Sequence, residues 1–353
     1  MTAQTAIDQD KLMTLVFQGV GDVGALLSGT LVVIGDKLGL YRAIRDNRSV
    51  TSNELARATG TAERYCREWL NNQAASAYVT YDGAGRYSLT PEQAEVFTNE
   101  KSPACLLGFY QIMTGATRAL PEILERFKTG DGFGWHEHDD DVFEGCERFL
   151  RPGYAANLIS AWLPALDGVV AKLEAGATVA DVGCGFGASS ILMAKAFPKS
   201  RFVGFAYHAR SIEAARTAAA EAGLANCTFE VASAKEYSGE YDLVCNFDCL
   251  HDMGDPVGAA KHVRETLKPG GTWLVVEPFA NDDVSGNLNP VGRVYYGAST
   301  LLCTPSSLSQ EVGLALGAQA GEARLRQVIT QGGFSSFRRA AETSFNIILE
   351  ART

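Results

Sequence analysis

The stretch VADVGCGFGASSILMA, residues 179–194, decides the fold of the second half of this sequence. Its apolar start predicts a buried strand, and its Ala- and Ser-rich end predicts a helix. The turn between them contains Gly183, Gly185 and Gly187. Glycines allow positive φ angles and let backbone N–H groups approach a ligand closely. The spacing differs from the dinucleotide fingerprint G-x-G-x-x-G. Asp181, at the tip of the strand, favours a cationic ligand group and would repel a pyrophosphate.

The pattern of strand, turn and helix continues after this stretch. Short apolar runs such as RFVGFA, CTFEVA, YDLVCNF and GTWLVVE alternate with helix-like segments at 188–197, 209–223 and 256–268. This alternation predicts a parallel sheet with helices on both faces. Two further strand candidates, 336–340 and 345–351, lie close enough in the sequence to pair as a terminal hairpin.

The N-terminal part of the sequence follows a different pattern. Residues 12–45 carry apolar residues at helical spacing with few charges, which predicts helices that need a partner surface. Thr51 and Glu54 form the signature of a capping box for a short helix that Gly60 closes. A second helix at about 61–73 and a hairpin around a Gly-rich turn follow. Helices followed by a small hairpin are typical of a winged-helix domain.

The composition limits the classes of protein that the sequence can represent. The 353 residues suggest two domains, and the net charge of −10 argues against a nucleic-acid partner unless a local basic patch exists. Between residues 42 and 69, six arginines stand against four acids, a small surplus for binding phosphates. The eight cysteines include no C-x-x-C pair and predict neither disulfides nor a zinc site. Because we find no signal peptide and no run of 18 apolar residues, we expect a cytoplasmic protein without a membrane partner.

The D-x-G-x-G-x-G loop and the alternating strands resemble class I S-adenosylmethionine-dependent methyltransferases. The whole chain resembles bacterial methyltransferases with a winged-helix front half, and it is similar to small-molecule O-methyltransferases that dimerise through such a domain. The resemblance implies an α/β fold with a Rossmann-like, doubly wound, seven-stranded sheet and an N-terminal α-helical winged-helix domain. We expect a winged-helix and dimerisation domain at 1–103, a helical connector and pocket cover at 104–172, and a methyltransferase domain at 173–353.

The resemblance also implies that the cofactor is S-adenosylmethionine and which residues hold it. Its methionine end falls on positions that match Asp181, Gly183, Gly185 and Gly187. The ribose and adenine fall on the end of the next strand, at positions that match Ala206 and Tyr207, and the loop with Ser233 and Ala234 lies beside the adenine. Asn246, at the tip of the fourth strand, closes the pocket. A carboxylate usually accepts both ribose hydroxyls at the first of these positions, so that Ala206 removes a contact. Ser233 stands where the family commonly has Asp.

The sequence LHDM, residues 250–253, follows the fourth strand of the predicted sheet. It resembles the L-H-D-W of small-molecule O-methyltransferases, in which the histidine removes a proton from the substrate hydroxyl. An imidazole suits this role at neutral pH, because its ordinary pKa is about 6.5. His251 is therefore the candidate general base. The alternative is that His251 is structural and only caps the following turn.

The remaining candidates surround the expected acceptor pocket. In FLRPGYAANL, residues 149–158, Pro152 and Gly153 are expected to break a helix and to deliver Tyr154, which in relatives reaches the carboxylate of the cofactor. The insertion 280–320 is expected to cover the pocket. Aromatic residues of these and neighbouring segments are candidates for substrate contacts: Trp135, Phe143, Tyr295 and Tyr296.

One segment, GWHEHDDD at 134–141, invites a metal interpretation. His136, His138 and the three acids could supply nitrogen and oxygen ligands. Methyl transfer from a sulfonium needs no metal, and acidic loops are usually just solvated. We therefore expect no metal site.

Two functions fit these observations. The first is a homodimeric cytoplasmic enzyme that transfers a methyl group from S-adenosylmethionine to an oxygen, sulfur or nitrogen of a small-molecule acceptor. The second is a ligand-sensing winged-helix transcriptional regulator with a degenerate methyltransferase domain. The absence of an acid at position 206, which is Ala206, favours this second function. Salt-dependent DNA binding would separate the two.

Overall fold

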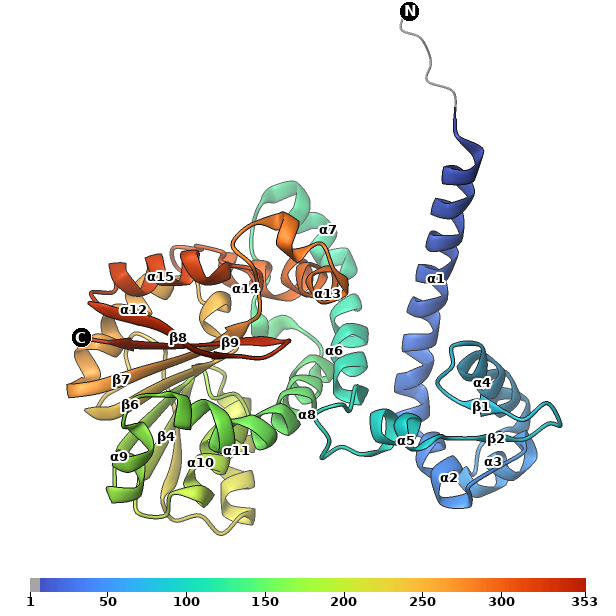
Figure 1. Ribbon diagram of the computed structural model, residues 1–353, viewed down its shortest axis with the longest axis horizontal. Coiled ribbons are helices and arrows are strands. Elements are labelled where there is room, and N and C mark those ends of the chain that lie inside the picture. Colours follow the sequence, from blue (N-terminus) through green and yellow to red (C-terminus); the bar gives the residue numbers. More distant parts are fainter. Residues whose placement is uncertain (1–6) are drawn as a thin grey trace, which may run out of the picture. The chain divides into compact units, whose positions relative to one another are not determined.

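The computed structural model describes residues 7–353, and residues 1–6, at the start of the predicted first domain, lie outside the described residues. The chain divides into two compact units, one that ends at Thr114 and one that comprises Gly115–Thr353 (Figure 1). Each unit encloses buried cores of its own. The finer division at residues 103 and 172 stays a prediction.

The first unit is a helical domain with a two-stranded hairpin. Its elements are α1 (Gln9–Lys37), α2 (Leu40–Asn47), α3 (Ser52–Thr59), α4 (Glu63–Ala75), β1 (Thr80–Tyr81), β2 (Tyr87–Ser88) and α5 (Pro91–Thr98), while α6 (Leu107–Thr117) continues into the second unit. The predicted capping box of Thr51 and Glu54 is present, and Gly60 ends α3 with a φ of 67°. The order of helices and hairpin confirms the predicted winged-helix fold.

The core of the first unit gathers around Trp69 of α4. Its indole Nε1 donates a hydrogen bond of 2.8 Å to the carbonyl of Leu31 in α1, and its ring meets that of Tyr41 edge to face. Gly35 allows this approach, because a Cβ atom there would lie 2.4 Å from the indole. The C-terminal end of α1 is thus fixed to the helices that follow it.

The rest of α1 presents apolar side chains to solvent. The exposed apolar residues of this helix are Leu12, Met13, Leu15, Val16, Phe17, Val20, Val23, Leu26, Leu27 and Ile34. By length and composition α1 could cross a membrane, and among residues 7–353 it is the one helix with this property. One such helix near the N-terminus is weak evidence for a membrane span. Exposed apolar faces of this size are typical of interaction surfaces.

The second unit is built on a seven-stranded mixed sheet with the order β5-β4-β3-β6-β7-β9-β8. The strands are β3 (Thr178–Val182), β4 (Arg201–Ala206), β5 (Cys227–Val231), β6 (Tyr241–Phe247), β7 (Leu267–Pro278), β8 (Ser336–Glu342) and β9 (Asn346–Arg352). The first five run parallel, and β9 lies antiparallel between β7 and β8. The predicted doubly wound sheet and its terminal hairpin are confirmed.

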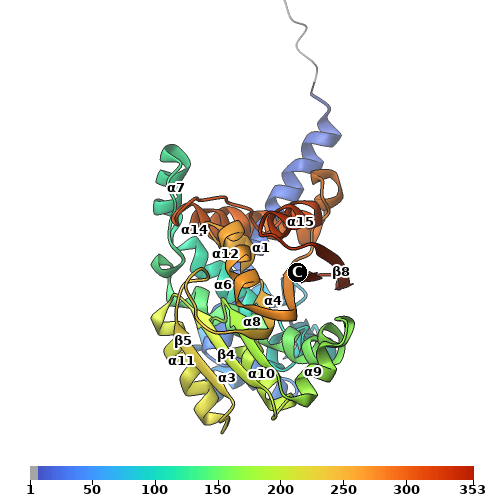
Figure 2. The same ribbon diagram turned by 90° about the vertical axis from the view of Figure 1, so that its left-hand side faces the viewer.

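Helices cover both faces of this sheet (Figures 1 and 2). One face packs against α9 (Val169–Ala175), α10 (Ala188–Ala196) and α11 (Ala209–Glu221), and the other against α12 (Pro256–Thr266) and α15 (Gly321–Gln331). Successive side chains of a strand point to opposite faces. Val179 and Ala180 of β3 accordingly belong to different cores. The central strands β3 and β6 are buried on both faces, and they are accordingly apolar over most of their length.

The helix around Tyr154 differs from the sequence-based expectation. Pro152 and Gly153 do not break it, because α8 runs without interruption over Asp140–Asn157. A proline removes a single main-chain hydrogen bond, and the helical bonding continues beyond it. The N–H of Leu158, for example, donates to the carbonyl of Tyr154. The remaining α-helices of this unit are α7 (Leu120–Thr129), α13 (Pro290–Ala298) and α14 (Thr304–Leu308), and short 3-10 and π turns lie between the elements.

Candidate active site

A cavity of about 420 Å³ lies within the second unit. The glycine loop after β3, the end of β4 and the loops after β5 and β6 line it, together with α8 and residues 306–311. The carboxyl ends of parallel strands are the usual place for a ligand in an open α/β sheet. The volume suits a small-molecule ligand.

The glycine loop has the backbone that the sequence predicts. Gly183, Gly185 and Gly187 all have positive φ angles, of 83°, 52° and 81°. The N–H groups of Gly183 and Cys184 both donate to the carbonyl of Phe205, which fixes the loop to β4. Gly183 and Gly185 line the cavity, whereas Gly187 packs beneath it against the ring of Phe229.

The position of Gly187 leads to a stability prediction. We expect Gly187→Ala to lower the free energy of unfolding by about 2–4 kcal/mol, because the added Cβ would meet a positive φ and overfill the core. It would lie 2.6 Å from the ring of Phe229. Thermal unfolding measures the change. Gly153→Ala in α8 is the control, since a Cβ there has nothing within 4 Å, and an equal loss in both variants would contradict this explanation.

Asp181 is buried beneath the loop and does not itself line the cavity. Its Oδ2 accepts hydrogen bonds from the hydroxyls of Ser189 and Ser190, at 2.5 and 2.6 Å. Its Oδ1 is buried and has no hydrogen-bond partner among the described residues. Burial raises the pKa of Asp181 to about 6, although both serines oppose the shift. An unpartnered buried carboxylate oxygen fits a ligand with a cationic group.

The cofactor residues predicted after β4, β5 and β6 fall into two groups. Ala206, Tyr207, Ser233 and Ala234 all line the cavity. Asn246 does not, because it is buried between strands, where its Nδ2 donates to the carbonyl of Val182 at 2.8 Å and its Oδ1 accepts from the Trp273 indole at 2.7 Å. The side chain of Asn246 therefore joins β3, β6 and β7 within the sheet.

Tyr154 reaches the cavity from α8 and binds an acid. Its hydroxyl donates to Oδ2 of Asp248 at 2.9 Å, and Asn346 donates to Oδ1 of the same residue at 2.8 Å. Asp248 lines the cavity and has a φ of 49°, an uncommon angle for a residue with a Cβ. Burial, with the nearby carboxylate of Glu277, raises the pKa of Asp248 to about 7.

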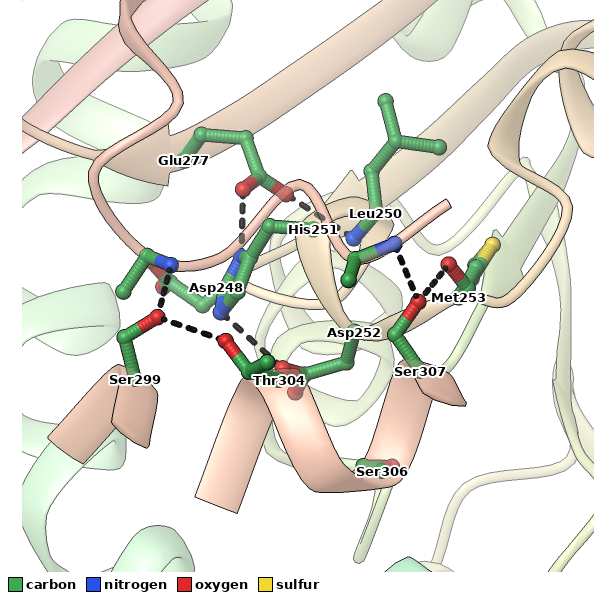
Figure 3. A network of polar contacts seen from close by, with 12 residues as sticks. Asp248, Leu250, His251, Asp252, Met253, Glu277, Ser299, Thr304, Ser306 and Ser307 are labelled. Atoms are coloured by element: carbon green, nitrogen blue, oxygen red, sulfur yellow. Dashed lines mark hydrogen bonds and ion pairs between the residues drawn. The ribbon is translucent and has the colours of Figure 1, made fainter. Parts of the chain in front are cut away.

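His251 lies behind the cavity wall, in a short 3-10 turn over Leu250–Asp252. Its Nδ1 is 2.5 Å from Oε2 of Glu277, whose Oε1 accepts from the N–H of Leu250 at 2.9 Å. Its Nε2 is 3.3 Å from Oδ1 of Asp252. Figure 3 shows the ring between these two carboxylates. Burial alone would lower the pKa of His251, but Asp252 and Glu277 raise it well above its ordinary value.

Of the four aromatic residues predicted to contact the substrate, two line the cavity and two do not. Trp135 and Phe143 line the cavity, and their rings meet edge to face at 5.6 Å. Phe143 also stacks on the ring of His208. Tyr295 and Tyr296, in α13, are not part of the lining, and the hydroxyl of Tyr295 donates to the carbonyl of Phe345 at 3.0 Å. The insertion 280–320 contributes to the cavity through Ser306, Ser309 and Gln310 instead.

Sequence reasoning missed three acids of this site. Asp248 and Asp252 line the cavity, and Glu277 holds His251 from the end of β7. The sequence signal for the first two was their place in the loop after a parallel strand. Asp248 precedes the LHDM motif by one residue, and Asp252 is part of it. Nothing in the sequence pairs Glu277 with His251. Glu277 lies in β7 and His251 in the 3-10 turn after β6, and the two meet only because β6 and β7 are neighbours in the sheet.

Comparisons with known proteins agree with this architecture. Residues 173–312 match a family model described as a methyltransferase domain, and residues 26–99 match an Rv2258c-like winged HTH domain. Trans-aconitate 2-methyltransferase from Deinococcus radiodurans is 30% identical over 115 residues, which are 32% of this chain and 42% of that enzyme. The chain therefore matches less than half of the length of this curated relative.

Solved structures of methyltransferases cover nearly the whole chain. The mitomycin 7-O-methyltransferase is 19% identical with a TM-score of 0.70, covering 98% of this chain and 100% of its own. Human N-acetylserotonin methyltransferase, in complex with S-adenosylmethionine, is 15% identical with a TM-score of 0.70 and covers 99% of both chains. These likenesses establish a shared fold. Residues 173–312 are thus a methyltransferase domain of the S-adenosylmethionine-dependent kind, and residues 26–99 are a winged helix-turn-helix domain.

Proposed function

We propose that this protein transfers a methyl group from S-adenosylmethionine to a hydroxyl oxygen of a small molecule. The observation that carries the proposal is one cavity that joins the glycine loop to the acids beside His251. S-adenosylmethionine, when bound, supplies an electrophilic methyl group on a sulfonium. Gly183, Gly185, Ala206 and Tyr207 line the cavity and would hold it, and the buried carboxylate of Asp181 beneath the loop would favour its cationic end.

The acid-rich end of the cavity supplies the proton chemistry. A hydroxyl attacks better when a neighbouring group takes its proton during the reaction. The pair His251 and Asp252, held in place by Glu277, is the group that we assign to this task. Trp135 and Phe143 offer an apolar wall for the acceptor. An acceptor sulfur or nitrogen would use the same wall and would need less help from the pair.

Isothermal titration with S-adenosylhomocysteine tests the cofactor part of the proposal. We expect saturable binding with one molecule per chain. If no heat of binding is measured at millimolar S-adenosylhomocysteine, the proposed function is wrong. Mass spectrometry of ligands that co-purify with the protein then addresses the acceptor.

The charge of the cavity predicts which acceptors are rejected. Of the described residues that line it, Lys235 carries the permanent positive charge, and it is already paired with Asp255 and Glu311. Asp248 and Asp252 face the acceptor end without a lysine or arginine partner. We expect neutral or cationic acceptors, and no binding of trans-aconitate, because its carboxylates would meet buried acids. Thermal shift with S-adenosylhomocysteine and trans-aconitate checks this, and a further rise of the melting temperature contradicts it.

The winged-helix unit does not require DNA binding. The arginines of α4, the helix that would enter DNA, are paired within the helix: Arg64 with Glu68 at 2.5 Å and Arg67 with Glu63 at 2.6 Å. Paired side chains leave little charge for phosphates. We expect no retardation of genomic fragments in a gel at low salt. Retardation that disappears as salt is added would favour the regulator hypothesis.

We further propose that α1 forms the interface of a cytoplasmic homodimer. Its exposed apolar residues continue into a groove of about 460 Å³ that Leu27, Leu31 and Trp69 help to line, which offers space for a second helix. Obligate interfaces commonly bury more than about 2,000 Å². We expect light scattering at micromolar concentration to give twice the mass of 37.8 kDa.

Two lysine substitutions test this interface. Val20→Lys combined with Leu27→Lys should give a monomer, because charges would be buried at the contact. Leu124→Lys in α7 is the control, since that leucine is equally an exposed apolar residue, at 56%, but lies in the second unit. A wild-type monomer that sediments with lipid vesicles would assign the face to a membrane and overturn the proposal.

A further inference from the structure

We infer that Asp252 is the group that receives the proton of the acceptor, and that His251 is a positively charged positioning residue behind it. The inference rests on the proposed methyl transfer to a hydroxyl and assigns its proton chemistry to one side chain. It differs from the expectation that the imidazole itself acts as the base.

Access to the cavity separates the two residues. Asp252 lines the cavity and His251 does not. The side chain of Asp252 is 22% exposed, against 5% for that of His251. A general base must come within hydrogen-bond reach of the proton it removes, either directly or through one water. The acceptor therefore meets Asp252 first, and the imidazole lies on the far side of this carboxylate.

The partners of the ring fix its protonation state. Nδ1 faces Glu277 and Nε2 faces Asp252, so a carboxylate stands at each nitrogen (Figure 3). A neutral imidazole has one N–H and would turn a lone pair toward one of the two carboxylates. Only the imidazolium presents a proton to both. In that form His251 has no lone pair left with which to accept a further proton.

The carboxylate of Asp252 keeps accepting capacity that its neighbour lacks. Asp248 also lines the cavity, but Tyr154 and Asn346 donate to its two oxygens. Oδ1 of Asp252 is buried beside Nε2 of His251 and makes no hydrogen bond of good geometry with any described residue, so the rest of this side chain, which is 22% exposed, is what an acceptor can reach. Asp252 is thus the better placed of the two acids to accept a proton.

The groups around Asp252 set how it titrates. Burial raises the pKa of Asp252, and the imidazolium of His251 acts in the opposite direction. Several other titratable side chains face Asp252 or lie within electrostatic range of it: Tyr207, Asp248, His251, Glu277, Cys303 and Cys146. Without the cation of His251, the acids of this set would raise the pKa of Asp252 further.

The reaction balances with this assignment. The acceptor O–H bond breaks and its proton passes to the carboxylate of Asp252, while the oxygen forms a bond to the methyl carbon. The carbon–sulfur bond breaks, and its electron pair stays on sulfur, which becomes a neutral thioether. Asp252 then returns the proton to water. His251 remains an imidazolium throughout.

Nitrogen NMR of the full chain with S-adenosylhomocysteine bound tests the state of His251. The chain has five histidines, so that the His251→Gln variant identifies the signal. We expect both ring nitrogens of His251 to remain protonated from pH 6 to pH 8, in wild type and with ligand. A neutral His251 at pH 7 overturns the inference, whether or not an acceptor is known. Failure of the protein to bind S-adenosylhomocysteine would instead count against the proposed function.

Kinetics with simple phenols as probe acceptors test Asp252. We expect Asp252→Asn to lower the rate by roughly 10²–10⁴ and Asp252→Glu to restore part of it. His251→Gln should also lower the rate at neutral pH, but unlike Asp252→Asn it should move the acidic limb of the pH–rate profile to higher pH, because the pKa of Asp252 rises when the cation is removed. Asp131→Asn, at an exposed position of the same unit, is the control. A rate of Asp252→Asn within tenfold of wild type overturns the inference, and if no phenol is methylated the NMR result decides.

Discussion

His251→Ala is expected to lower turnover by roughly 10²–10⁴ while the affinity for S-adenosylmethionine stays unchanged. The substitution removes the cation between Glu277 and Asp252, which leaves two buried carboxylates facing each other. Buried acids without a counter-charge take up protons instead of remaining ionised. Asp252 then can no longer accept the proton of the acceptor. His251 is outside the cavity lining, so contacts to the cofactor persist.

Two measurements separate this effect from general damage to the fold. Turnover is measured by the transfer of labelled methyl groups, and affinity by titration with S-adenosylhomocysteine. His262→Ala provides the matched control, because that histidine lies in α12 and donates from Nε2 to the carbonyl of Tyr237, outside the lining of the cavity. An unchanged rate in His251→Ala would mean that the acceptor needs no deprotonation by the enzyme or that His251 is structural.

Ala206→Asp is expected to tighten the binding of S-adenosylmethionine and S-adenosylhomocysteine alike, by roughly tenfold to a hundredfold. Ala206 ends β4 and lines the cavity next to Tyr207, so a longer side chain there enters the space of the ligand. A carboxylate at this point can accept both ribose hydroxyls. Both ligands carry the same ribose, and for this reason both should gain equally.

Ala206→Asn is the matched control for this variant. Asn has nearly the same shape as Asp but offers a neutral acceptor, and neutral hydrogen bonds contribute about 0.5–1.5 kcal/mol. We expect it to gain less affinity than Ala206→Asp in the same titration. If Ala206→Asp leaves both dissociation constants unchanged or weakens them, the ribose is held elsewhere and our interpretation of this position is wrong.

Local patterns predicted the fold well, because its elements depend on local sequence. The capping box at Thr51 and the alternation of apolar runs after Gly176 specify helices and strands without reference to distant residues. Pro152 shows the limit of such rules. A proline interrupts an isolated helix, whereas in α8 the proline is buried and the surrounding turns keep their bonds. Packing outweighs local preference at this position.

The cofactor end of the site could be predicted to a greater extent than the acceptor end. The glycine loop lies within a few residues of one strand, and its motif is therefore visible in the sequence. The acid cluster brings together Asp248, Asp252 and Glu277 with Tyr154 and Asn346, which come from different strands and helices. No spacing along the chain encodes such a meeting. The prediction for Asn246 failed for the same reason. Its side chain lies within the sheet, where Trp273 of the neighbouring strand donates a hydrogen bond to it.

The strand β9 lies between β7 and β8, and this placement determines when the second unit can fold during synthesis. Ile347, Ile348 and Leu349 are fully buried, and Ile347 is paired in register with Glu277. A ribosome makes residues 346–352 after all the strands they join. Until they emerge, β7 has an open edge and Asp248 lacks its partner Asn346. The contacts of the winged-helix core lie entirely within the first unit. This unit can complete its fold while the methyltransferase site is still unfinished.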